Sequence, residues 1–118
     1  MKPSRHATGL WAEKKAEVLL MLKGYRILAR RFKTPSGEID LVAKRGSLLV
    51  FVEVKHRQSV SDAAEAVHAK NRQRVEQAAA LYLQKHPEYN DLDMRFDVII
   101  VTPGAWPQHI SAAWRVDG

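Results

Sequence analysis

Three side chains that could carry out acid, base or metal chemistry, Asp40, Glu53 and Lys55, stand in two apolar segments of the sequence. The segments, residues 38–43 and 48–55, are rich in Ile, Val, Leu and Phe, which is typical of strands. Carboxylates are the oxygen ligands that Mg²⁺ prefers, and a lysine ammonium can stabilise negative charge on a phosphate. Whether the three side chains act together depends on how the two segments pair.

The pair Gly46-Ser47 predicts the pairing, because Gly at the first central position favours a two-residue type II′ hairpin turn. Residues whose numbers add to 93 then face each other, so Asp40 lies opposite Glu53. Strand side chains alternate between faces, so we expect one face to carry the polar groups and the other to be core. The polar face holds Glu38, Asp40, Val42, Phe51, Glu53 and Lys55, and the core face holds Ile39, Leu41, Ala43, Val50, Val52 and Val54.

Two opposed carboxylates, with Cβ atoms about 4.5–5.5 Å apart, repel each other. Glu38 adds a third negative charge beside Asp40, and Lys55 alone cannot neutralise all of them. A bound divalent cation would, because Mg²⁺ takes one or two carboxylates and completes its shell with water and phosphate oxygens. The alternatives are a solvated sheet face with a Glu38–Lys55 surface ion pair, or a bulge that slips the register by one residue.

The remaining sequence predicts an α/β domain in the order α-β-β-β-α-β-β, with a central mixed sheet flanked by helices. Apolar residues at helical spacing predict two helices, and Gly24 and Pro87 suit their ends. We expect no linker, so that 1–118 forms one domain. The expected elements are helices 7–23 and 66–86 and strands 25–32, 38–43, 48–55, 95–101 and 109–116.

Composition points to a basic protein with no thiol chemistry. The net charge is +6 and there is no Cys, which excludes disulfides and thiolate metal sites. A basic domain attracts polyanions, so nucleic acid is a plausible partner. Charged residues interrupt the N-terminal segment, so we expect no signal peptide, no membrane span and a cytoplasmic protein. The five His are expected to lie at the surface or to have no specific role, and Trp11, Trp106 and Trp114 are expected to pack rather than to stack on bases.

The string Gly37-Glu38-Ile39-Asp40, followed after twelve residues by Glu53-Val54-Lys55, resembles the PD-(D/E)xK nuclease signature, with Ile39 in place of the signature's Pro. A wider match over about residues 7–101 resembles the YraN-like family of small bacterial proteins. This resemblance implies a restriction-endonuclease-like fold, similar to that of archaeal Holliday-junction resolvases. The wider match is carried by Gly9, Glu13, Ala16, Gly24, Tyr25, residues 51–55, Lys70 and residues 95–98.

The resemblance implies a site of four catalytic residues, Asp40, Glu53, Lys55 and the helix-borne Glu13. Asp40, Glu53 and the Val54 backbone carbonyl would bind Mg²⁺ or Mn²⁺. Basic side chains near the signature and on the second helix could contact phosphates, although a solvated surface is the alternative for most of them. These side chains are Arg31, Lys33, Arg57, Lys70, Arg72 and Arg74.

These observations favour a metal-dependent nuclease that hydrolyses phosphodiester bonds in DNA, either branched or single-stranded. Resolvases act as dimers, so a homodimer is a further expectation. A nucleic-acid-binding module of the same fold that does not cleave is the first alternative. A protein-interaction domain with merely exposed acids is the second, and it predicts no steeply salt-dependent binding to nucleic acid.

Overall fold

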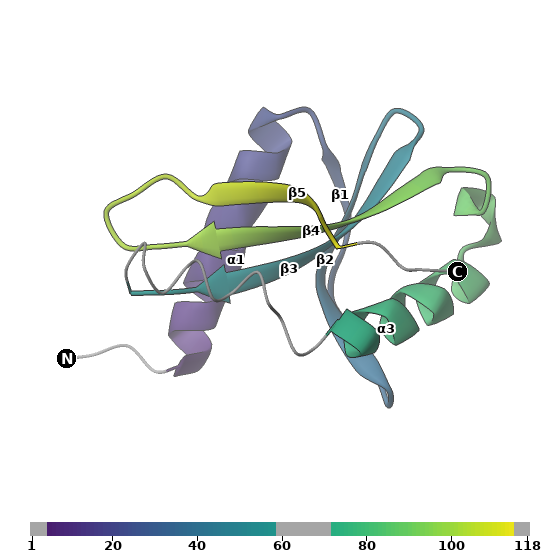
Figure 1. Ribbon diagram of the computed structural model, residues 1–118, viewed down its shortest axis with the longest axis horizontal. Coiled ribbons are helices and arrows are strands. Elements are labelled where there is room, and N and C mark those ends of the chain that lie inside the picture. The colour runs from purple at the N-terminus through teal and green to yellow at the C-terminus, as the bar shows by residue number, and fades with distance from the viewer. Residues whose placement is uncertain (1–4, 59–71, 115–118) are drawn as a thin grey trace.

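The computed structural model describes residues 5–58 and 72–114, and these form a five-stranded sheet between two helices (Figure 1). The sheet order is β1-β2-β3-β4-β5, with β3 and β4 parallel and the other pairs antiparallel. The predicted class and element order are confirmed. The elements are α1 (Arg5–Leu22), β1 (Arg26–Thr34), β2 (Gly37–Arg45), β3 (Leu48–His56), α3 (Arg72–Lys85), the 3₁₀ turn η1 (Pro87–Tyr89), β4 (Asp93–Val101) and β5 (Gln108–Trp114).

The hairpin of β2 and β3 has the predicted register. Leu41 pairs with Val52 and Ala43 with Val50, so the paired residue numbers add to 93. Gly46 has φ of 60°, as the first central residue of a type II′ turn requires. The turn signal therefore predicted the pairing of residues 41–45 with 48–52, while the predicted Asp40–Glu53 and Glu38–Lys55 pairs lie beyond the end of the observed ladder.

Both faces of the hairpin are buried, which corrects the prediction of one open face. Leu41, Ala43, Val50 and Val52 pack under α1 as core residues, as predicted. Val42 and Phe51, however, are fully buried in a second cluster under α3, on the face that was expected to be polar. The α3 segment connects the parallel strands β3 and β4 and covers this face, as helices do in parallel α/β sheets.

Ile39 is buried as predicted, but it does not share a face with Leu41, because it packs in the α3 cluster with Val42. Side-chain alternation is therefore broken between Ile39 and Leu41. The β2–β3 ladder stops at the Leu41–Val52 pair, so β2 leaves β3 at Asp40. The candidate carboxylate stands at this point of separation.

Two features fix α1 against the sheet. At its C-terminus the Tyr25 amide donates to the Leu20 carbonyl at 2.9 Å and the Gly24 amide to the Met21 carbonyl at 3.0 Å. This Schellman pattern needs a left-handed residue, and Gly24 supplies it with φ of 90°. Along one flank, Glu13 and Glu17 form ion pairs with Arg31 and Arg30 of β1.

The described part of the second helix ends at Lys85, directly before His86-Pro87 as predicted. Its predicted first turns, including Lys70, lie outside the described residues, as do residues 115 and 116 of the predicted last strand. Among the described helices, none is both long and apolar enough to cross a lipid bilayer.

Candidate functional site

The Asp40 carboxylate lies where β2 separates from β3 and is tied to β3. Its Oδ2 accepts a hydrogen bond of 2.7 Å from the Val54 backbone amide. This side-chain contact takes over where the backbone ladder has ended. The Asp40 carboxylate is therefore held against β3, although the Asp40 backbone is not paired with that strand.

Several negative charges surround Asp40. Burial raises the pKa of its carboxyl group to about 6, and the Val54 amide opposes this effect, while the charges of Glu13, Glu53 and Glu38 raise the pKa further. The carboxylates that were predicted to form one site are therefore close enough to Asp40 to repel its negative charge. Glu13 belongs to α1, and the others belong to the hairpin. A positive charge at this position would stabilise the ionised form of Asp40.

Glu53 keeps one carboxylate oxygen without a partner. Its side chain is 9% exposed, and Oε1 lies 2.5 Å from the Lys55 ammonium nitrogen. Oε2 is buried and has no hydrogen-bond partner in the described part of the chain. A buried carboxylate oxygen without a partner is destabilising. A ligand that binds Glu53 Oε2 would remove this cost and so stabilise the folded protein.

A hard divalent ion fits these donors. Asp40 and Glu53 offer carboxylate oxygens, and the remaining positions around Mg²⁺ or Mn²⁺ are ordinarily water or phosphate oxygens. Within residues 5–58 and 72–114, no three His, Asp or Glu side chains converge as a complete metal cage. Two carboxylates nevertheless match what magnesium takes from a protein in phosphate chemistry.

Glu13 faces Asp40 but is engaged by Arg31, whose Nε donates to Glu13 Oε2 at 2.8 Å. This hydrogen bond raises the pKa of the Arg31 guanidinium. Arg31 also has φ of 50°, an unusual conformation for a residue with a side chain. The strained backbone thus presents a cation at a pocket lined by Glu13, Arg31, Lys33, Glu38, Ile39 and Asp40.

Arg74 reaches the site from α3 because the helix lies directly on β2. A Cβ atom at Gly37 would lie 1.9 Å from the Arg74 carbonyl oxygen, so only glycine permits this approach. The result is a pocket of about 290 Å³ beside the first one. Its lining brings the signature residues together with Arg74: Glu38, Asp40, Glu53, Val54, Lys55, Arg74 and Val75.

Two of the other predicted phosphate-binding residues, Arg72 and Arg57, do not line either pocket. The Arg72 guanidinium lies 5.6 Å from the centre of the Trp114 ring, at the β5 side of α3. Arg57 follows β3 and donates to the His56 carbonyl oxygen at 2.8 Å. Lys70 lies outside the described residues. The structure therefore groups Arg31, Lys33 and Arg74 with the acids.

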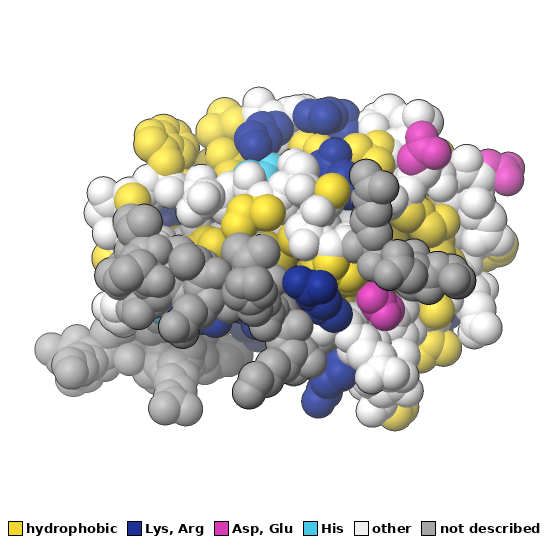
Figure 2. Space-filling view, in the orientation of Figure 1, with side chains coloured by type: hydrophobic (Ala, Val, Ile, Leu, Met, Phe, Trp, Pro, Cys, Tyr) yellow, Lys and Arg dark blue, Asp and Glu magenta, His cyan; other side chains and the backbone are white. Residues whose placement is uncertain are grey.

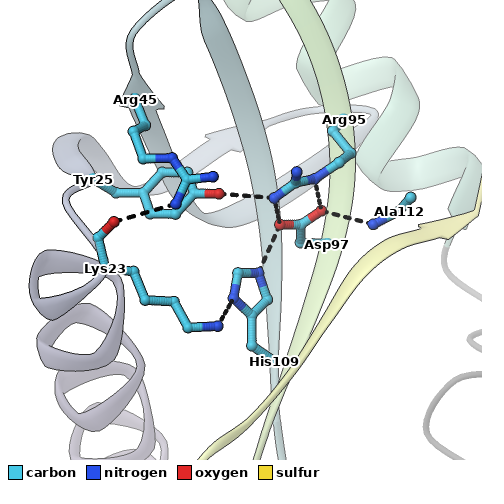
Figure 3. Close-up of polar contacts among 7 residues, drawn as sticks. All are labelled: Lys23, Tyr25, Arg45, Arg95, Asp97, His109 and Ala112. Carbon is cyan, nitrogen blue, oxygen red and sulfur yellow. Dashed lines mark hydrogen bonds and ion pairs between the residues drawn. The ribbon is translucent and has the colours of Figure 1, made fainter.

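A second polar cluster, which the sequence did not predict, is centred on Asp97 (Figure 3). Asp97 is fully buried and accepts hydrogen bonds from Arg95 at 2.7 and 2.8 Å, from His109 at 2.7 Å and from the Ala112 amide at 3.0 Å. Arg95 also donates to the Tyr25 hydroxyl. A lone acid inside the apolar strand 95–101 was the available signal for this cluster.

Two expectations about aromatic side chains are wrong. His109 was expected to lie at the surface or to have no specific role, but its side chain is buried against Asp97 because Lys23 and Asp97 satisfy its two ring nitrogens. Trp106 was expected to pack, but it is 78% exposed in the loop after β4. Trp114 does pack, in the cluster under α3.

Comparison with known proteins identifies the family. Residues 12–101 match the family described as "Uncharacterised protein family UPF0102". The chain belongs to this family. The chain is 53% identical to a UPF0102 protein of Parvibaculum lavamentivorans over 107 residues, which are 91% of this chain and 80% of that protein. It is 49% identical to one of Nitrobacter winogradskyi over 97% of both chains. The YraN-like assignment made from the motifs is confirmed.

A solved structure supports the fold. The chain is similar to Hjc of Archaeoglobus fulgidus, a Holliday junction resolvase from an archaeal hyperthermophile, with a TM-score of 0.53 and 18% identity. The match covers 93% of this chain and 79% of the resolvase. The restriction-endonuclease-like fold implied by the signature is confirmed.

Proposed function

We propose that this UPF0102 protein is a metal-dependent nuclease that hydrolyses phosphodiester bonds in DNA. The observation that supports this most directly is the pocket shared by Asp40, Glu53 and Lys55, in which Glu53 Oε2 is buried and has no hydrogen-bond partner among residues 5–58 and 72–114. The fold shared with a protein named as a Holliday junction resolvase makes DNA the first substrate to test.

In this proposal Asp40, Glu53 and the Val54 carbonyl bind Mg²⁺ or Mn²⁺. The bound ion would supply Lewis acidity at the phosphate and lower the pKa of an attacking water. The Val54 amide holds the Asp40 carboxylate in position for binding. Glu13, whose charge acts on Asp40, adds a fourth acidic group to the site.

Lys55 has an electrostatic role in this proposal. Its ammonium lies against Glu53, in the pocket that also holds Asp40 and Arg74. A fixed ammonium can stabilise the charge that develops on the phosphate oxygens during attack. Arg74, Arg31 and Lys33 line the two pockets and would contact flanking phosphates, which sets affinity rather than sequence preference.

The test is a panel of DNA substrates: a four-way junction, a flap, a single strand and a blunt duplex, each with Mg²⁺, with Mn²⁺ and with chelator. We expect metal-dependent cleavage of at least one branched or single-stranded substrate. Asp40→Asn, Glu53→Gln and Lys55→Ala should each lower the cleavage rate by about 10² or more. Glu88→Gln, at an exposed acid of η1, is the matched control. Cleavage that persists unchanged in the three site variants contradicts the proposal.

A nucleic-acid-binding module that does not cleave is the second candidate, and one contact favours it. Lys55 already supplies a positive charge to Glu53 at 2.5 Å, so the protein neutralises part of its own acid pair. This candidate predicts that the substrates bind with metal or chelator alike and that no product forms in any lane. The same panel, read for binding as well as cleavage, separates the two.

A further inference from the structure

A separate hollow lies on the α1 side of the sheet, between α1 and the loop that joins β4 to β5. It has a volume of about 430 Å³ and is mainly apolar. Lys14, Lys15, Val18 and Leu19 of α1 form one wall, and Ala105 and Trp106 of the loop form the other. Trp106 is 78% exposed, the highest value among the exposed large hydrophobic residues of the described chain. An exposed indole beside an apolar hollow is typical of a binding surface.

This groove lies at the same end of the sheet as the candidate nuclease site. In the parallel pair of β3 and β4, Lys55 is opposite Ile100 and His56 is opposite Val101. The loop with Trp106 begins directly after this pair. Glu13, which acts on Asp40, and Lys14, which lines the groove, are consecutive residues of α1. A strand of nucleic acid at the nuclease site could therefore continue over α1 into the groove.

The chemistry of the groove favours a nucleic-acid strand as its occupant. None of its described lining residues is acidic, while two are lysines. Lys15 Nζ also lies 4.0 Å from the centre of the Trp11 ring, and Trp11 contacts His56 at the end of β3. Indole faces and ammonium groups thus lie close together on this side of α1. Single strands bind to such surfaces by stacking bases on the aromatic rings and by pairing phosphates with the cations.

Other occupants fit less well. The cores of protein interfaces are depleted in lysine, whereas lysines flank this groove. A second copy of the chain would bring another net charge of +6. In a blunt duplex, base faces are stacked on each other and are not available to Trp106, so an unpaired segment is required.

We propose that the groove binds an unpaired nucleotide of the DNA substrate, with the base on the Trp106 indole and neighbouring phosphates on Lys14 and Lys15. This inference rests on the proposed function in one respect, that the ligand is DNA. It narrows the substrate class to DNA that carries a single-stranded segment. Cleavage is not part of the inference, so the two can be tested apart.

The test measures binding in chelator, where no cleavage occurs. The probes are a fluorescent oligothymidylate single strand and a blunt duplex of equal length, and binding is followed by fluorescence anisotropy. Trp106→Ala should weaken binding of the single strand about tenfold or more and leave duplex binding within about twofold of the unmodified protein. Trp106→Phe should restore most of the affinity, because it keeps a stacking face. Lys14→Gln should weaken single-strand binding and lower its dependence on salt.

Leu22→Ala is the control variant, since Leu22 is 70% exposed at the far end of the same helix. Unchanged single-strand affinity in Trp106→Ala overturns the inference. An equal loss for single strand and duplex overturns it as well, because base stacking would not be involved. A dimer in solution that Trp106→Ala converts to a monomer, with DNA binding intact, would show instead that the groove is a protein interface.

The outcomes also distinguish this inference from the proposed function. A protein that binds oligothymidylate through Trp106 but cleaves no substrate contradicts only the nuclease proposal. A protein that cleaves DNA with metal, and whose Trp106→Ala variant binds single strands normally, contradicts only the groove. Glu88→Gln, at a residue that lines neither the groove nor the candidate nuclease site, should leave oligothymidylate binding in chelator intact.

Discussion

At the scale of single residues, the charged form of Asp40 is needed for the proposed metal binding but destabilises the folded protein. Its pKa in the folded protein is about 6, because burial and the neighbouring acids disfavour the charged form. An unfolded chain gives the group its ordinary value of 3.8. Between these values the folded state binds more protons than the unfolded state. Stability therefore falls as the pH rises from about 4 to 6, and the full penalty applies above pH 6.

Removing this charge should stabilise the metal-free protein. We expect Asp40→Asn to raise the free energy of unfolding at pH 8 in chelator by on the order of 1–2 kcal/mol, because the amide oxygen can still accept from Val54. The gain should shrink towards pH 4, where Asp40 is protonated in the folded state. Urea unfolding at pH 4, 6 and 8 measures this. Glu88→Gln, at an exposed carboxylate that is not among the charges acting on Asp40, is the control. An Asn variant that is less stable at pH 8 contradicts the argument.

Asp97 has the opposite effect on stability. Its burial alone would raise the pKa, but hydrogen bonds from His109, Arg95 and Ala112 lower it to about 2. Because the folded value is below the ordinary 3.8, the stabilisation is complete above about pH 4 and is lost as the pH falls towards 2. Ala112 has φ of 51°, and the hydrogen bond that its backbone amide donates to Asp97 helps to hold that conformation.

We expect Asp97→Asn to destabilise the protein by about 3 kcal/mol at pH 7, since it leaves the Arg95 charge partly buried without its partner. The variant should also lose less stability between pH 4 and 2 than the unmodified protein does. Thermal or urea unfolding across that range tests both effects. His86→Gln, at a half-buried histidine outside the cluster, is the comparison. An Asn variant with unchanged stability would show that the cluster contributes little.

At the scale of elements, the contact between α3 and β2 builds the site. Gly37 is placed so that a Cβ atom would meet three Arg74 backbone atoms within 3 Å. We expect Gly37→Ala to destabilise the fold by about 2 kcal/mol or more, because a helix backbone cannot yield as a flexible side chain does. It should also weaken DNA binding by moving Arg74 away from the pocket.

Gly46→Ala separates steric from conformational effects. A Cβ atom there meets nothing within 4 Å, but φ is 60°, so the cost is backbone strain of about 1 kcal/mol. We expect Gly46→Ala to lower stability with little effect on DNA binding, in contrast to Gly37→Ala. Parallel measurements of unfolding and of duplex binding distinguish them. Gly37→Ala that behaves like Gly46→Ala in both measurements would show that α3 does not position Arg74.

In the β2–β3 hairpin, the strand register could be predicted from the sequence, but the helix that covers each face could not. The turn signal at Gly46-Ser47 was local, so it predicted the register of β2 and β3. The face of Ile39 was wrong because β2 leaves β3 at Asp40, next to the close approach of α3 at Gly37, and neither is marked by a turn signal in the sequence. Alternation within one strand contains no information on which helix covers each face, so Val42 and Phe51 could not be placed under α3.

Polar clusters that span several elements were the other failure. Asp97 and His109 belong to neighbouring strands, and Lys23 and Tyr25 follow α1, so no sequence spacing links them. Trp106 was expected to pack, but its exposure depends on how the β4–β5 loop lies beside α1. Asp40, Glu53 and Lys55 were predicted because they lie in two recognisable strands and in a motif that resembles the nuclease signature. Their prediction did not depend on contacts between distant parts of the chain.

At the scale of the whole molecule, cations surround the acidic site. The net charge is +6, and Figure 2 shows Lys and Arg side chains beside α3 and at the upper edge of the molecule. Arg31 and Lys33 lie on one side of Asp40, and Arg74 lies on the other. Such an arrangement attracts a polyanion from a distance and leaves the two carboxylates to meet it at close range.

This arrangement predicts DNA affinity that falls steeply with salt, because each phosphate that is paired with a Lys or Arg releases counterions. A plot of the logarithm of affinity for duplex DNA against the logarithm of salt concentration, measured in chelator, should be linear. Arg74→Ala should reduce its slope by about one unit, since it removes one phosphate contact. Lys85→Ala should leave the slope unchanged, because Lys85 lies at the other end of α3, with its ammonium 5.6 Å from the Phe32 ring centre. Equal slopes for the two variants would mean that the charge of the whole molecule, rather than the cations at the site, binds DNA.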